Sequence, residues 1–272
     1  DNKLLKYLHS VDPKTRELAI YALANIGDST FIDQLNFLLA GPFEDYPNKE
    51  DLTATAFLLG QIPSQKSIEM ISFLMKNLPD NAEEKIFVLS KVADAIGKTG
   101  NENDLNKICS LYSSSNLNDT ALTRAVSMSI ARFALRKIKN EKSVESLKLI
   151  LKNSSDTIAL RNSAYAFWRI GDKKLLEKAA EEIYQLAESK DSQTRMWAYN
   201  ATGKLQNELF LLYTLESFNS EKDWRVKVNM LNSLLNYELD SLSDLTKQLY
   251  SIIGDGIGDE NEHISLTAIN VF

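Results

Sequence analysis

The chain has 272 residues, with 31 lysines and arginines against 37 aspartates and glutamates, which gives a formal net charge of −6. This length suits a large buried core or a long stack of repeats, and the mild acidity argues against non-specific nucleic-acid binding by the whole surface. A single cysteine, Cys109, excludes an intrachain disulfide. No stretch approaches the ~18 consecutive apolar residues of a membrane-spanning helix. Because Cys109 falls on the apolar side of an expected helix, we expect a buried structural thiol.

Apolar residues with helical spacing recur along the whole chain, and no alternating strand pattern of useful length lies between them. A short helix is expected over residues 3–8, followed by a clear helix over residues 13–26. Further helices are expected around the apolar positions of residues 31–39, 68–75, 105–112, 144–151, 176–186, 209–215 and 242–252. The segment Gly41–Asn48 contains two prolines and a glycine, so it is expected to be the longest irregular connection.

A column of mostly small residues, each followed by a larger one, recurs every 32 to 39 residues. Its members are Ala22, Leu58, Ala95, Ala134, Ala166, Ala201, Ser233 and Ala268. A period in this range, held over eight copies, is typical of a solenoid of helical pairs. A small residue in the apolar stripe of a helix lets the neighbouring helix approach closely, so the column predicts how successive pairs pack.

The clearest copy of the pattern spans residues 12–28. Asp12 is a plausible N-cap and Pro13 suits the first helical position. The apolar stripe is expected to comprise Leu18, Ala19, Ala22, Leu23 and Ile26. Gly27 then ends the helix in the left-handed conformation that glycine adopts at low cost. Residues 156–172 repeat this arrangement.

The endings Ile26-Gly27-Asp28 and Ile170-Gly171-Asp172, with the alanine-rich helices before them, resemble the HEAT repeat family. The resemblance is to the bacterial subclass first noted in phycobilin lyases, and it covers essentially the whole chain. It implies an all-α fold, an α-solenoid with a right-handed superhelix of about eight HEAT-like helical pairs. Residues 1–272 would form a single solenoid domain, with the second helix of each pair on the concave side. Because HEAT arrays serve many roles, the resemblance is nearly silent on function.

The last copy stops at Phe272, one position short of the glycine slot. Solenoids normally close with a polar-faced capping repeat, whereas Ile264, Ala268, Ile269 and Phe272 would have no following helix to cover them. We therefore expect the chain to be a fragment of a longer protein.

Catalytic residues, metal ligands and cofactors are not predicted. The two histidines, His9 and His263, are not followed by glutamate, whereas the HEAT-repeat hydroxylases that act on deoxyhypusine use repeated His-Glu pairs. Residues 255–260 lack the ligand spacing of an EF-hand. HEAT-like DNA glycosylases need an acid, tryptophans and basic groups. Trp168 and Arg169 permit that alternative, but the acidic net charge and the missing motif count against it.

The sequence therefore favours a non-catalytic scaffold that binds a protein or peptide partner on its concave face. One alternative is a HEAT module attached to a catalytic domain outside these residues, such as a cyclophilin-type prolyl isomerase. A structural spacer between other domains is a third. The sequence does not indicate the partner, the compartment or the oligomeric state.

The candidate binding residues occupy two slots of the repeat. The position three residues after the small column carries a cation in four consecutive copies. The position just before the small column carries aromatic residues in several copies. With their immediate neighbours, the candidates are Lys98, Phe133, Arg136, Lys137, Tyr165, Trp168, Arg169 and Lys204. Exposed aromatics interleaved with cations favour an extended acidic or aromatic partner. In the alternative interpretation, the aromatics fill seams between helices and the cations form an ordinary solvated face. The absence of a long basic cluster favours a peptide or small domain over nucleic acid, and the Gly41–Asn48 segment is the next candidate.

Arginines near the starts of three second-type helices, Arg16, Arg161 and Arg195, each follow an aspartate four or five residues back. HEAT families often carry Asp–Arg ladders between successive repeats at this place. We expect such stacking between residues 156–161 and residues 191–195, with a structural role.

Overall fold

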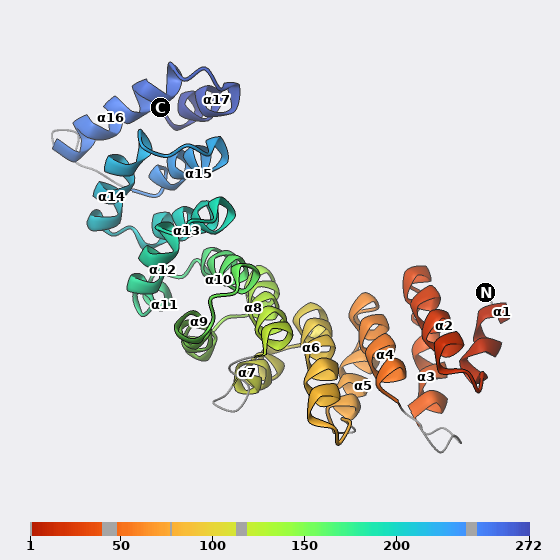
Figure 1. Cartoon of the computed structure of the whole chain (residues 1–272). Coiled ribbons are helices and arrows are strands. Elements are labelled where there is room, and N and C mark those ends of the chain that lie inside the picture. Colours follow the sequence, from red (N-terminus) through yellow and green to blue (C-terminus); the bar gives the residue numbers. More distant parts are fainter. Residues whose placement is uncertain (1, 40–47, 77, 113–118, 238–243) are drawn as a thin grey trace. The chain divides into compact units, whose positions relative to one another are not determined.

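The structure, a computed structural model, describes residues 2–39, 48–76, 78–112, 119–237 and 244–272. These residues are helical throughout their regular structure, with no strand among them, and the helices follow one another as pairs (Figure 1). The all-α solenoid of HEAT-like helical pairs expected from the sequence is therefore confirmed.

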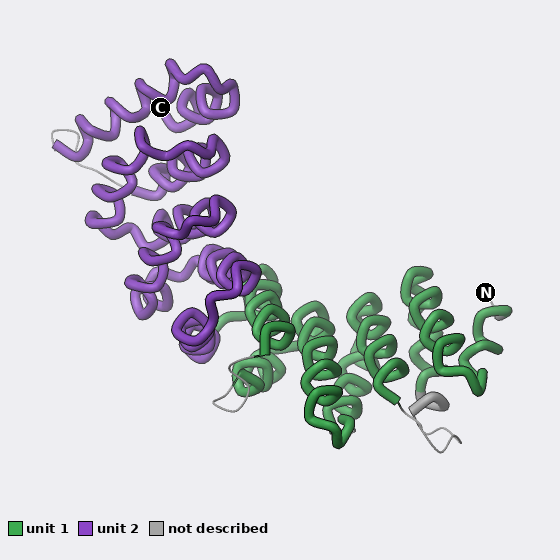
Figure 2. Tube along the Cα trace, in the orientation of Figure 1, with its two compact units in different colours: residues 1–139 green, residues 140–272 purple. Residues whose placement is uncertain are grey.

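The chain divides into two compact units, residues 1–139 and residues 140–272 (Figure 2). Each unit is described by itself below. The expectation of a single domain over residues 1–272 stays a prediction.

Unit 1 contains four helical pairs. Its elements are α1 (Asn2–Leu5) with the 3₁₀ helix η1 (Lys6–His9), α2 (Pro13–Ile26), α3 (Phe31–Leu39), α4 (Lys49–Gln61), α5 (Gln65–Lys76), α6 (Ala82–Thr99), α7 (Glu102–Leu111) and α8 (Thr120–Leu135). The second helices α2, α4, α6 and α8 pack consecutively as one layer, and α5 and α7 cover that layer from one side. Cys109 of α7 is buried, as expected.

Unit 2 repeats this plan. Its helices are α9 (Glu141–Asn153), α10 (Thr157–Ile170), α11 (Lys173–Glu177), α12 (Ala180–Ala187), α13 (Ser192–Leu205), α14 (Glu208–Phe218), α15 (Trp224–Leu234), α16 (Asp244–Ile257) and α17 (Glu262–Val271). Here α10, α13, α15 and α17 form the layer of second helices. Since α16 runs on to Ile257, half of the segment 255–260 is helical.

Both ends of the second helices are fixed by local chemistry. Each begins at an Asp or Asn whose side chain accepts backbone N–H groups of the first turn: Asp12, Asn48, Asn81, Asp119, Asp156, Asp191, Asp223 and Asn261. Gly27 and Gly171 end α2 and α10 with φ of 75° and 50°, as expected. After α8 and α13, which lack this glycine, Lys137 and Gln206 keep the left-handed turn, with φ of 68° and 52°. The end of α15 at Leu235 has right-handed geometry.

Small residues bring neighbouring second helices into backbone contact. A Cβ placed on Gly97 of α6 would lie 2.7 Å from Cα of Ser129 in α8, and one placed on Gly203 of α13 would lie 2.9 Å from Cα of Ser233 in α15. The equivalent distance from Gly60 of α4 to Cα of Ala95 is 3.0 Å. Packing through the small column is therefore confirmed at Ala95 and Ser233.

In the fourth copy the expected register was wrong, because the residue at the close approach is Ser129 and not Ala134. Ala134 is buried, but the following Leu135 is 50% exposed. The N-cap of α8 is Asp119, so Ser129 is its tenth following residue, as Ala166 is for Asp156. The contact position in this helix is thus set by distance from the cap. The helix simply runs further beyond it than α10 does.

In the first copy the expected apolar stripe was right at Ala19 and Leu23, which are buried, and wrong at Leu18 and Ile26, which are 59% and 45% exposed. Arg16 and Ile20 complete the buried face of α2. These residues have helical spacing and face η1 and α4. The face is rotated because Arg16 turns inward to reach a carboxylate on α4.

The helix expected over residues 176–186 is broken into α11 and α12. At the break, Lys178 N–H and Ala179 N–H donate to carbonyls three residues back, those of Leu175 and Leu176. The carbonyl of Lys178 then accepts a 2.7 Å hydrogen bond from Nζ of Lys148. The break keeps the apolar side chains of both short helices facing α13.

At the end of unit 2, two of the four residues expected to lack a following helix are exposed. Ile264 and Ala268 are buried, at 2% and 0% exposure, whereas Ile269 and Phe272 are exposed, at 54% and 79%. Packing of α17 against α15 and α16 covers the first two.

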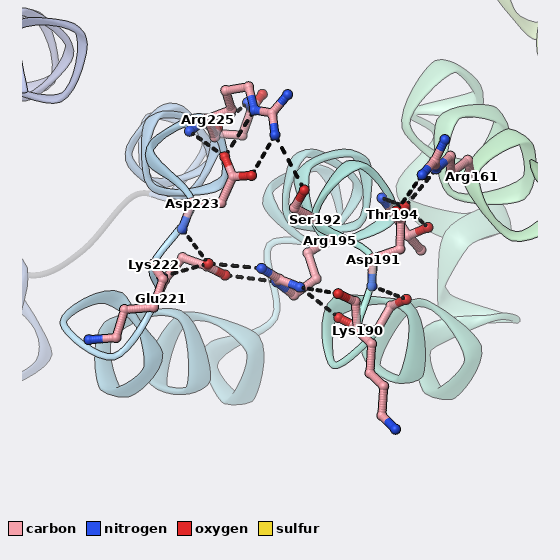
Figure 3. A network of polar contacts seen from close by, with 12 residues as sticks. Arg161, Lys190, Asp191, Ser192, Thr194, Arg195, Glu221, Lys222, Asp223 and Arg225 are labelled. Carbon is pink, nitrogen blue, oxygen red and sulfur yellow. Dashed lines mark hydrogen bonds and ion pairs between the residues drawn. The ribbon is translucent and has the colours of Figure 1, made fainter. Parts of the chain in front are cut away.

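Arginines near the N-terminal ends of second helices bridge successive repeats (Figure 3). Arg161 of α10 donates through Nε and Nη2 to both carboxylate oxygens of Asp191, at 2.8 and 2.5 Å. Arg195 of α13 binds Glu221, which lies just before α15, in the same way at 2.8 and 2.9 Å. The predicted stacking between residues 156–161 and residues 191–195 is therefore confirmed.

Unit 1 holds a buried version of this bridge. Arg16 binds Asp51 of α4 through Nε and Nη2, and the two side chains are 3% and 1% exposed. Its Nη1 also donates to the carbonyl oxygens of Ser10 and Val11. A guanidinium near a helix N-terminus faces an unfavourable dipole, and these acceptors offset it.

Asp191 holds two roles at once, because it is both the N-cap of α13 and the partner of Arg161. The hydrogen bond from Arg161, opposed by partial burial and assisted by Thr194, lowers the pKa of its carboxyl from 3.8 to about 2. A carboxyl whose pKa is depressed in the folded state stabilises the fold above its unfolded pKa, and this contribution disappears as the pH falls through the folded pKa.

Replacing Gly97 with alanine should destabilise unit 1. The new Cβ would meet the backbone of Ser129 at 2.7 Å, and overpacking of this kind costs ~1–3 kcal/mol. Gly254 of α16 is the matched control, because a Cβ there meets nothing within 4 Å. Alanine at Gly254 should therefore raise the free energy of unfolding by ~0.5–1 kcal/mol. Urea denaturation of both variants measures these changes. An equal increase in the free energy of unfolding at the two positions would contradict the close backbone contact between α6 and α8.

Replacing Asp191 with asparagine should keep the helix cap and remove the ion pair. The free energy of unfolding should fall relative to the wild type at pH 7, and this difference should shrink as the pH drops from about 4 toward 2. Urea denaturation at several pH values measures it. Asp244, whose side chain is 87% exposed, gives the control Asp244→Asn with little effect. A pH-independent difference at Asp191 would count against the proposed electrostatic origin.

Candidate functional site

The eight candidate binding residues are divided between the units. Lys98, Phe133, Arg136 and Lys137 lie in unit 1, and Tyr165, Trp168, Arg169 and Lys204 lie in unit 2. All of them lie in or near the last turns of second helices. Cations are favoured at the C-terminal end of a helix by its dipole, so this placement alone explains part of the cation row.

Phe133 cannot contact a partner, because its side chain is fully buried at 0% exposure. Its inclusion in the predicted surface was wrong. The register of α8 explains the error, since the longer helix turns this aromatic position into the core of unit 1.

Arg136 binds the chain itself. Its Nη1 and Nη2 donate to the carbonyl oxygens of Gly100 and Gly97, at 2.7 and 3.0 Å, and so close the C-terminal end of α6. The guanidinium carbon also lies 4.8 Å from the ring centroid of Phe133. Partial burial lowers the pKa of Arg136.

Lys98 is likewise engaged within unit 1. Its Nζ lies 3.1 Å from a carboxylate oxygen of Asp94, which also accepts a hydrogen bond from Arg132. Burial raises the pKa of Asp94, but the hydrogen bond and charge of Arg132, together with Lys98, outweigh burial and lower it. Of the unit 1 candidates this leaves Lys137, an exposed residue in a left-handed turn.

Unit 2 holds an aromatic cluster between α10 and α13. The rings of Trp168 and Trp197 are stacked, with centroids 4.9 Å apart and an interplanar angle of 15°. Tyr165 meets both indoles edge-on, at 5.1 Å from Trp197 and 5.7 Å from Trp168. All three side chains are half-buried. The cluster therefore fills the seam between two helices and still presents aromatic surface to solvent.

Arg169 lies over this cluster. Its guanidinium carbon is 3.9 Å from the ring centroid of Trp168 and 4.9 Å from that of Tyr165. Such cation–π contacts contribute ~0.5–2 kcal/mol. Its Nε is shut off from solvent and has no hydrogen-bond partner.

Amide side chains continue the same face toward α15. Nδ2 of Asn200 donates to Oδ1 of Asn229, and Nζ of Lys204 donates to Oδ1 of Asn236 at 2.8 Å. Trp197, Asn200 and Lys204 have the spacing i, i+3 and i+7, which places them on one face of α13.

We call Tyr165, Trp168, Arg169, Trp197, Asn200, Lys204 and Asn229 the unit 2 face. The candidates predicted from the sequence did not include Trp197, Asn200 and Asn229. Asn200 lies in the slot just before the small column but was not counted as a candidate, and Trp197 and Asn229 lie outside the two slots considered. The spacing of Trp197 from Lys204 was the signal that could have found the face on α13.

Other candidates add nothing to this surface. Residues 41–47 of the Gly41–Asn48 segment lie outside the described residues, and Asn48 is the N-cap of α4. Within the described parts of the chain, no group of three or more His, Cys, Asp or Glu is arranged to hold a metal ion. The helices of these parts include none that is long and apolar enough to cross a membrane.

Comparisons with known proteins give little beyond the fold. No protein-family model matches the sequence, and no curated protein matches it. Among solved structures, the crystal structure of Kap121p is similar at 11% identity and a TM-score of 0.44, over 99% of this chain and 37% of that one. Human deoxyhypusine hydroxylase in complex with glycerol is similar at 14% identity and a TM-score of 0.38, over 99% and 93% of the two chains. Similarities at this level carry no argument about function.

Proposed function

We propose that this chain is a non-catalytic HEAT-repeat scaffold of the phycobilin-lyase-like subclass, which binds an extended peptide segment of a partner protein on the unit 2 face. The observation that carries the proposal is the half-buried stack of Trp168 and Trp197 with Arg169 above it. Tryptophan, tyrosine and arginine are the residues most enriched where a few side chains supply most of the binding energy.

The shape and chemistry of the face favour an extended segment over a compact ligand. Its residues run across α10, α13 and α15, which pack side by side. Nδ2 of Asn200 donates to the carbonyl of Met196 and to Asn229, and Nδ2 of Asn229 donates to the carbonyl of Arg225. This leaves Oδ1 of Asn200 as an acceptor and one N–H of Asn229 as a donor for a peptide backbone. Aromatic surface beside them suits apolar side chains of the partner.

The contrast between the units supports placing the site in unit 2. Lys98 and Arg136 are occupied by Asp94 and by helix carbonyls. Lys204 is exposed and hydrogen-bonds only to an asparagine amide. Its charge therefore stays available to a partner.

A random library of short linear peptides, selected against the full chain, tests the proposal. Selected peptides should bind saturably, and Trp197→Ala and Lys204→Glu should each weaken binding about tenfold by removing contact area or reversing charge. Isothermal titration calorimetry measures the affinities, and circular dichroism melting confirms that each variant is folded.

Trp224→Ala is the matched control for the tryptophan, because Trp224 stacks on His263 of α17 instead of the cluster. Lys222→Glu makes the same charge change on an exposed lysine outside the face. Peptides that bind all four variants equally would place the site elsewhere. A chain that selects no peptide would remove the proposed function.

A further inference from the structure

Within the described chain, Arg169 has no hydrogen-bond acceptor, in contrast to Arg16, Arg132, Arg161, Arg195 and Arg225. Among the described residues it makes ring contacts only, with Trp168 and Tyr165. Its Nε is shut off from solvent, whereas its two terminal nitrogens are not among the buried polar atoms that lack a partner. The terminal nitrogens therefore reach solvent and can accept an incoming partner.

The chain itself shows what an arginine in this layer binds. Arg16, Arg161, Arg195 and Arg225 each use Nε and Nη2 to hold both oxygens of one carboxylate. The carboxylates come from Asp51, Asp191, Glu221 and Asp223. These four lie near the N-terminal ends of their helices. At the C-terminal end, where Arg169 lies, Arg132 pairs with the carboxylate of Asp94 and Arg136 donates to the carbonyl oxygens of Gly97 and Gly100. Arg169 has neither kind of acceptor among the described residues.

The surroundings of Arg169 favour an external anion. The other members of the unit 2 face are aromatic, amide or cationic, and Arg169 forms no ion pair among the described residues. The side-chain stem of Lys204 lies beside Gly171, two residues after Arg169, with its Cγ 3.9 Å from the position of a Cβ there. Two cations that form no ion pair within the described chain complement an anion.

The position of the guanidinium defines how that anion would bind. The contact with the ring of Trp168 positions the guanidinium, and its Nε is already buried. The two terminal nitrogens are the part left for an incoming group. Their fork matches the two oxygens of a carboxylate in a bidentate pair.

We propose that Arg169 is the receptor for a carboxylate of the partner peptide, an Asp or Glu side chain, bound end-on by its two terminal nitrogens with Lys204 beside it. This inference rests on the proposed function and names the chemistry of the segment that the unit 2 face takes. Apolar or aromatic residues next to the acid would lie against Trp197.

The test uses the peptides selected against the full chain. They should be enriched in Asp or Glu next to an apolar residue. Replacing that acid with its amide in the peptide should weaken binding to the wild-type chain about tenfold. The same replacement should weaken binding to the Arg169→Gln variant by less than about twofold, because that variant already lacks the group that binds the carboxylate. For the Arg169→Lys variant, which keeps the charge but loses the two-pronged guanidinium, the loss of affinity on the acid-to-amide change should lie between these two values.

Two controls separate this effect from a loss of folding. Arg225→Gln removes an arginine of α15 that is already paired with Asp223. For this variant, the acid-to-amide change in the peptide should still weaken binding about tenfold. The acid-to-amide change is made in the peptide, so the wild-type comparison does not depend on any variant folding.

Each outcome decides the matter. Selected peptides that depend on Trp197 but show no acid preference, or that lose equal affinity on wild type and Arg169→Gln, would overturn the carboxylate receptor and leave the proposed function standing. Enrichment in Lys or Arg would overturn it as well. Failure to select any peptide would remove the proposed function, and this inference with it.

Discussion

The backbone contact between neighbouring second helices is the constraint on which each unit depends. At Gly60, Gly97 and Gly203 there is no room for a Cβ without moving the next helix. Close approach at these points fixes how each helical pair sits on the one before it. Every other contact between repeats, polar or aromatic, is made at a spacing that this seam sets.

The arginine bridges follow from that spacing. Second helices packed this closely place the arginine of one helix within reach of a carboxylate at or just before the start of the next, as in Arg161 with Asp191 and Arg195 with Glu221 (Figure 3). Partly exposed ion pairs contribute little on average, but these are bidentate, and Asp191 also caps a helix. They therefore fix the N-terminal ends of the helices, while the small residues fix their middles.

The opposite ends of the second helices carry the surface that differs between the units. In unit 1, Asp94 and the carbonyls of α6 occupy Lys98, Arg132 and Arg136. In unit 2, the corresponding region holds aromatic rings, amides and Arg169 without an acceptor. Cations at this end of the helices are therefore mostly paired within unit 1, whereas Arg169 of unit 2 makes ring contacts only among the described residues.

The sequence by itself determined the helical-pair repeat, the caps and glycine stops, the buried thiol and the existence of inter-repeat arginine pairs, because each of these depends on spacing within one or two neighbouring helices. Only the tertiary structure decided which side of each helix faces inward. A buried partner such as Asp51 rotated the face of α2, and the length of α8 beyond its contact point turned Phe133 into the core. The tertiary structure also placed Trp197 beside Trp168 in the candidate surface. The stacking of two indoles depends on how two helices cross, and the residue pattern along either helix does not encode that crossing.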